Sequence, residues 1–111
     1  MQAILIANDS LMREKIVTGD KKITIRRGKR DYKIGPVMLC CHLEPFAILA
    51  DITEVRQTTL REVKVNELQD DGFTNHVDLL QGLREYYPNM SLSDNVTVVR
   101  WENPRGKLVI S

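Results

Sequence analysis

The stretch GDKKITIR, residues 19–26, marks the point where the hydrophobic pattern of the chain changes from helical to extended. Apolar residues recur at helical spacing over residues 11–17, and Gly19 stands where a helix typically ends in the left-handed conformation. Beyond Gly19 polar and apolar residues alternate, which directs two isoleucines into a core and places Thr24 and Arg26 on the opposite face. The sequence therefore predicts a short helix, a bend and a strand in immediate succession.

The remainder of the chain predicts further strands joined by short helices. Strands are expected over residues 2–7, 37–43, 46–55 and 96–101, with a turn over 103–106 leading into a last strand at 108–110. A helix that ends before Pro88 is expected to bury one apolar stripe, formed by Val77, Leu80, Leu83 and Tyr87. Five to six strands with only two or three short helices indicate an α+β fold built on a small β-barrel.

Length and composition limit the number of domains and the kinds of binding function that the chain can have. A chain of 111 residues has the size of one domain, so we expect a single domain over residues 1–111. Lys and Arg total 16 against 15 for Asp and Glu, so net charge gives no general nucleic-acid or membrane signal. Aromatic residues make up only 5%, which argues against a platform that stacks several bases in a row. A pocket for one base is compatible with this composition.

The cysteines give no sign of a disulfide or a metal site. Cys40 and Cys41 are neighbours in an apolar run, and a strand would send them to opposite faces. His42 follows them, but this spacing is poor for zinc, so no metal is expected. No apolar run approaches the roughly 18 residues that span a bilayer, and the first residues lack the basic region of a signal peptide. We therefore expect a cytoplasmic protein that makes no membrane contact.

The central stretch also resembles the G-x-K-x-x-E-x-R signature of the ASCH domain, a small β-barrel relative of the PUA RNA-binding module. Gly19, Lys21 and Arg26 match this signature, while Thr24 stands where most members have Glu. With Thr at this place, the stretch looks like the ASCH branch that hydrolyses the acetamide of N4-acetylcytidine. The resemblance covers about residues 8–101. It implies a PUA-like fold, a nucleoside or modified base as substrate, and no cofactor.

Such a hydrolase needs a nucleophile and a base, and the resemblance implies Thr24 and Lys21 for these roles. A lysine acts as a base only when it is neutral, a form that the adjacent cations Lys22, Arg26 and Arg27 would favour. Lys21 and Thr24 have opposite parity in an ideal strand. They are therefore expected to converge only if the strand begins at Lys22 or carries a bulge near Gly19.

A supporting carboxylate is expected in the segment before the last helix. The resemblance implies Asp71, which would hold Lys21 or relay a proton, although Asp before Gly72 also commonly just starts a turn. Glu67 is the substitute carboxylate if Asp71 points away.

Substrate contacts are expected from residues around the same strand. Arg26 would bind a carbonyl or phosphate, or else form an ion pair on the strand face, and Tyr32 would stack on the base or anchor its loop. The loop from Arg27 to Lys33 is rich in basic residues, so it either contacts the phosphates of RNA or is a solvated hairpin loop.

The leading hypothesis from the sequence is a metal-independent amidohydrolase that acts on N4-acetylcytidine or a related N-acylated pyrimidine. A non-catalytic module that binds RNA or a modified nucleotide is the alternative from another class. An ASCH-type ribonuclease is a third reading, which would cut RNA instead.

Overall fold

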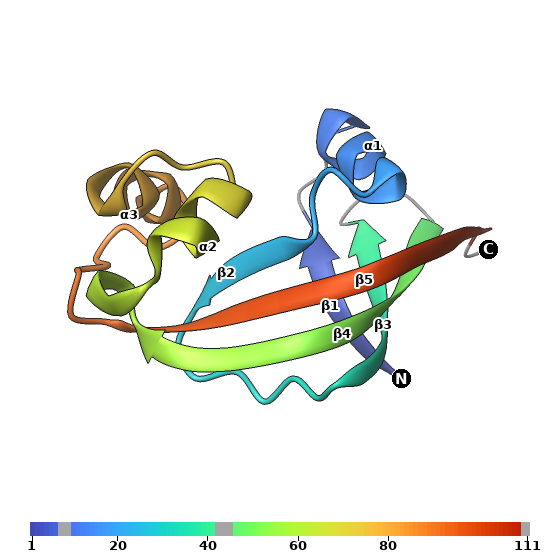
Figure 1. The fold of residues 1–111 in the computed structure, drawn as a ribbon, viewed down its shortest axis with the longest axis horizontal. Coiled ribbons are helices and arrows are strands. Elements are labelled where there is room, and N and C mark those ends of the chain that lie inside the picture. Colours follow the sequence, from blue (N-terminus) through green and yellow to red (C-terminus); the bar gives the residue numbers. More distant parts are fainter. Residues whose placement is uncertain (7–9, 42–45, 110–111) are drawn as a thin grey trace.

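The structure, a computed structural model, describes residues 1–6, 10–41 and 46–109, and within them five strands form one curled, half-barrel sheet (Figure 1). In spatial order these strands are β1 (Gln2–Ile6), β3 (Gly35–Cys41), β4 (Phe46–Thr59), β5 (Asn95–Val109) and β2 (Ile23–Arg27). The β1–β3 pair is parallel, and the other pairs are antiparallel. The expected α+β fold built on a small curled sheet with short helices is confirmed, with β1 and β2 as the two edges of the sheet. His42 and the ends of the strands expected at residues 2–7, 37–43 and 108–110 lie outside the described residues.

The long β4–β5 ribbon differs from the sequence prediction. β5 runs without interruption from Asn95 to Val109, so the turn expected over residues 103–106 is wrong. β4 is longer than expected and offers backbone partners to β5 over most of its length. The turn-forming residues are accommodated as a register shift opposite Leu49, with Asn103 at a φ of 56°. A strand with a bulge therefore replaces the expected hairpin.

The three α-helices of the described residues lie on the same side of the curved β4–β5 ribbon, α1 near one end and α2 and α3 near the other (Figure 1). Their bounds are Ser10–Thr18 for α1, Val65–Asp70 for α2 and His76–Arg84 for α3, and a 3-10 turn, η1 (Leu60–Glu62), precedes α2. The expected buried stripe of α3 is correct for Leu80 and Leu83. It is wrong for Val77, which is 56% exposed, and Tyr87 lies beyond the end of the helix.

The buried apolar residues form two clusters, and β5 contributes residues to both. The first packs α2, α3 and η1 against Ile23, Ile25 and Val98, and the second contains α1, β1, β3 and Trp101. Burial of this apolar area is the main stabilising contribution to the fold. None of the helices among the described residues is long and apolar enough to cross a membrane.

Candidate active site

Lys21 enters the site through the bend between α1 and β2. Gly19 ends α1 at a φ of 86°, a conformation that a residue with a side chain adopts only with strain. The Lys21 N–H then donates to the carbonyl of Lys15 at 3.0 Å, and β2 begins only at Ile23. Lys21 is thus outside the strand and free of its alternation. This removes the parity conflict with Thr24.

Lys21 and Thr24 line one cleft of about 630 Å³ at the junction of the two clusters, a volume typical of small-molecule sites. Its lining comes from both ends of the fold: Leu5, Ile6, Met12, Lys21, Thr24, Ile25, Arg26, Asp71, Phe73, Gly82, Leu83, Tyr86, Tyr87 and Trp101. The two edge strands border it together. Residues that are far apart in sequence therefore surround one concave surface.

Asp71 pairs with Lys21 in this cleft. The Lys21 ammonium donates to Asp71 Oδ1, and the two side chains are only 16% and 9% exposed. Burial raises the pKa of the Asp71 carboxyl above its ordinary value, although the charge and hydrogen bond of Lys21 and the charge of Arg26 act in the opposite direction. Asp71 also starts the turn before Gly72, which has a φ of 88°. The two interpretations of Asp71 are therefore compatible.

Arg26 fixes the hydroxyl of Thr24. Its Nε donates to Thr24 Oγ1 at 3.0 Å, and its Nη2 donates to the Leu5 carbonyl at 2.6 Å, which links β2 to β1 across the open side of the sheet. Thr24 is only 7% exposed. Since Arg26 occupies one acceptor position, the Thr24 proton is free to point elsewhere. Within the described chain, Lys21 donates to Asp71 and not to Thr24.

The aromatic walls of the cleft were not foreseen. Phe73, Tyr86, Tyr87 and Trp101 line it, and the rings of Tyr86 and Tyr87 lie 6.5 Å apart. Trp101 is fully buried, and its indole Nε1 has no hydrogen-bond partner among the described residues. A single Trp at a strand end and a Tyr pair before a Pro were the available sequence signals. Neither signal indicates a cleft without the fold.

Three expected substrate-binding residues do not line the cleft. Tyr32 packs against the second apolar cluster, which favours the loop-anchor interpretation. Glu67 is held by two donors of Arg56 and by the Lys64 N–H, so it is not the carboxylate beside Lys21. Arg27 lies outside the lining, with its guanidinium 5.8 Å from the centre of the Tyr87 ring. Its contact with the site is thus through Tyr87.

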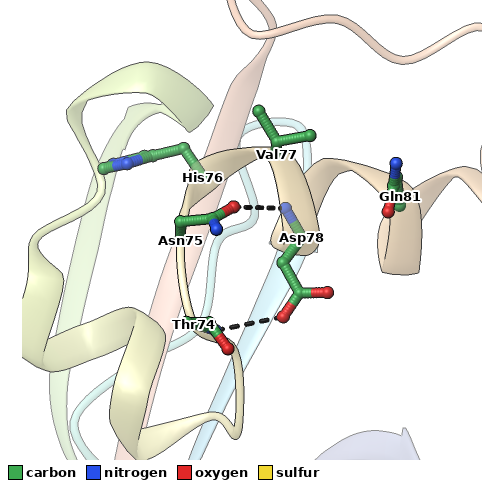
Figure 2. Close-up of a pocket in the computed structure, with 6 residues that line it drawn as sticks. All are labelled: Thr74, Asn75, His76, Val77, Asp78 and Gln81. Atoms are coloured by element: carbon green, nitrogen blue, oxygen red, sulfur yellow. Dashed lines mark hydrogen bonds between the residues drawn. The ribbon is translucent and has the colours of Figure 1, made fainter.

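A second hollow at the start of α3 carries no comparable chemistry (Figure 2). Asn75 accepts from the Asp78 N–H at 2.8 Å, and the Thr74 N–H donates to the Asp78 carboxylate at 3.0 Å. The His76 ring points away from these groups and lies 2.7 Å from the carbonyl of Val63. The polar groups therefore cap the helix. Across residues 1–6, 10–41 and 46–109, no group of three His, Cys, Asp or Glu residues is placed to hold a metal ion.

Comparison with known proteins finds solved structures with a similar fold. No protein-family profile and no curated protein matches the chain. A mutant form of the ASCH protein of Zymomonas mobilis is similar with a TM-score of 0.67 and 14% identity, over 98% of this chain and 75% of that chain. The ASCH domain of Lactobacillus crispatus JV V101 gives a TM-score of 0.70 and 10% identity, over 91% of this chain and 77% of that chain. At such identities the similarity concerns the fold alone. The chain therefore has the fold of the ASCH domain.

Proposed function

We propose that this chain is an amidohydrolase that releases the acetyl group of N4-acetylcytidine or a related N-acylated pyrimidine. One observation carries the proposal: Lys21, Thr24 and Asp71 line the same cleft, where Asp71 pairs with Lys21 and Arg26 holds the Thr24 hydroxyl. A hydroxyl, an amine and a carboxyl are the groups that amide hydrolysis without a metal requires.

The Lys21–Asp71 pair supplies the base. In its charged form Lys21 cannot accept a proton, but transfer of one proton to Asp71 would leave a neutral amine beside a neutral acid. Burial favours the protonated form of Asp71, because it raises the pKa of this carboxyl. Asp71 then acts as a proton relay for Lys21, and the amine would turn from Asp71 to Thr24, which lines the same cleft.

The reaction would proceed through an ester on Thr24. Thr24 Oγ1 attacks the acetyl carbonyl carbon while Lys21 takes the hydroxyl proton, and the C–N bond breaks as this proton passes to N4 of cytosine. Water then adds to the ester carbonyl with Lys21 again as base. The Thr24 hydroxyl regains a proton, and acetate leaves.

Two donors in the lining could stabilise the oxyanion that forms during attack. Arg26 is held beside Thr24, and the Trp101 indole N–H is buried without an acceptor among the described residues. A buried N–H without a partner costs roughly 1–3 kcal/mol, so an oxygen of the bound ligand would recover this energy. Trp101→Phe should therefore lower kcat while the ring volume is largely kept.

The test is product release. Purified protein incubated with N4-acetylcytidine in EDTA should yield cytidine and acetate in equal amounts, measured by liquid chromatography and NMR. Unchanged substrate with folded protein would contradict the proposal. Binding of N4-acetylcytidine without turnover would instead support the alternative of a non-catalytic module that binds modified nucleotides.

A further inference from the structure

Two arginines, Arg27 and Arg30, lie next to the cleft and contact Tyr87 in its lining. Ion pairs among the described residues involve Lys21, Lys22, Lys33, Arg56, Arg100 and Arg105. Neither Arg27 nor Arg30 contacts a carboxylate in that part of the chain. An arginine without a carboxylate partner keeps its donors available for an anion, and guanidinium donors match the geometry of phosphate.

Arg27 is the last residue of β2, and Arg30 lies in the loop that follows, which is fixed at several points. The Arg30 N–H donates to Thr97 Oγ1 at 2.8 Å, and the same hydroxyl donates to the Gly28 carbonyl at 2.7 Å. Gln57 holds the Arg30 carbonyl at 3.0 Å, and Arg30 Nε donates to the Arg27 carbonyl at 2.9 Å. Thr97 is fully buried, so the anchor lies inside the protein. The interpretation of this loop as merely solvated is therefore incomplete.

Tyr87 connects the two arginines to the cleft. The Arg27 guanidinium lies 5.8 Å from the centre of the Tyr87 ring, and Arg30 Nη2 lies 3.5 Å from its hydroxyl. Tyr87 itself lines the cleft that contains Thr24. One aromatic ring thus separates the place of the reacting base from two unneutralised positive charges. In a nucleotide, one ribose separates the base from its phosphate in the same way.

We infer that Arg27 and Arg30 form a phosphate subsite, so that the preferred substrate is a phosphorylated form of the N-acylated nucleoside. The inference rests on the proposed function, because it specifies the form of that substrate. The phosphate is either the 5′-phosphate of a mononucleotide or a backbone phosphate of RNA. In both cases the base enters the cleft past Tyr87 while the arginines hold the phosphate.

The test measures binding without turnover. Isothermal titration of the Thr24→Val variant with N4-acetylcytidine and with its 5′-monophosphate gives a ratio of affinities. We expect the monophosphate to bind about tenfold more tightly or better, the effect of one charge-assisted hydrogen bond. Adding Arg27→Gln and Arg30→Gln should bring the ratio close to one. Lys29→Gln, which removes one positive charge between the two arginines, should keep the ratio within about twofold, whereas each single arginine variant should not.

The outcomes separate the two sources of phosphate and the two proposals. Tighter binding of a short RNA that carries one N4-acetylcytidine than of the monophosphate identifies RNA as the source, and the reverse identifies a mononucleotide. Equal affinity for the nucleoside, the monophosphate and the RNA overturns the subsite, as does a ratio that survives loss of both arginines. Cytidine and its 5′-monophosphate give a second ratio of affinities. This ratio tests the subsite without the acetyl group. A failure of hydrolysis alone would therefore overturn the proposed function and leave the subsite measurable.

Discussion

Two carboxylates with largely buried side chains, Glu67 and Asp71, lie four residues apart along α2 and the turn after it. Their surroundings differ, and we assign Glu67 to the stability of the fold and Asp71 to the proposed reaction. Burial alone would raise the pKa of Glu67, but hydrogen bonds from Arg56 and the Lys64 N–H outweigh it and hold this pKa below its ordinary value. Among the described residues Asp71 has one side-chain donor, Lys21, and burial raises the pKa of Asp71. The number of donors thus decides whether a buried carboxyl stays a fixed anion or can exchange a proton. Only Asp71 lines the cleft.

The largest expected effect comes from removing the amine of the reactive pair. Lys21→Met keeps most of the side-chain stem and should lower kcat by about a thousandfold, as expected when general-base catalysis is lost. Steady-state kinetics on N4-acetylcytidine would measure this loss. Asp71→Asn should cost less, since it only positions Lys21 and relays its proton. An Asp71→Asn loss larger than that of Lys21→Met would reverse the assigned roles.

Breaking the Arg56–Glu67 pair should lower the stability of the fold and leave kcat nearly unchanged. Glu67→Ala leaves Arg56 and the Lys64 N–H without their acceptor, and loss of one partner of a buried pair costs about 3 kcal/mol or more. Urea unfolding would show this as a lower midpoint, while kcat of the remaining folded protein should change little. A selective fall in kcat at unchanged stability would mean that Glu67 belongs to the site.

The two carboxyls should also give opposite pH dependences of stability. Because the folded pKa of Asp71 is raised, its contribution is fully present below the unfolded value near 3.8 and is lost as pH rises through the folded pKa. For Glu67 the folded pKa is lowered, so its contribution is present above 4.5 and is lost as pH falls. Each unit of difference in pKa is worth about 1.4 kcal/mol.

Urea unfolding at several pH values between 3 and 7, compared with Asp71→Asn and with Glu67→Gln, measures both contributions. As pH falls through this window, the stability difference between wild type and Asp71→Asn should move in favour of wild type. The difference for Glu67→Gln should move against wild type. If the stability difference from wild type changed in the same direction with pH for both variants, the two carboxyls would not have contrasting environments.

The smallest expected effect concerns the aromatic wall of the cleft. A Cβ at Gly82 would lie 2.8 Å from Cε1 of Phe73, so Gly82→Ala must displace this ring, which lines the cleft. Overpacking costs about 1–3 kcal/mol, partly offset by the roughly 1 kcal/mol better helix propensity of Ala. We expect KM to rise severalfold with a smaller change in kcat. Gln81→Ala, on the exposed side of α3, is the matched control and should leave KM unaltered.

The sequence predicted what depends on local pattern and missed what depends on long-range pairing. The bend at Gly19 and the partnership of Lys21 with Asp71 followed from turn chemistry and from the resemblance. The Arg56–Glu67 pair was missed because it requires β4 to extend past the expected end of the strand. Continuous β5 was missed for a related reason, since pairing along β4 overrides the local turn preference. The place of Trp101 in the cleft depends on how two apolar clusters meet, which no local pattern encodes.

The most direct test of the central claim is the rate of cytidine release by Thr24→Val. This change keeps the β-branched shape and removes only the hydroxyl, and Thr53→Val on the exposed face of β4 is the matched control. The account predicts that Thr24→Val lowers kcat by about a thousandfold or more, that combination with Lys21→Met adds little, and that Thr53→Val remains active. Near-normal kcat for folded Thr24→Val would contradict it, because Thr24 would then be a strand residue and not the nucleophile.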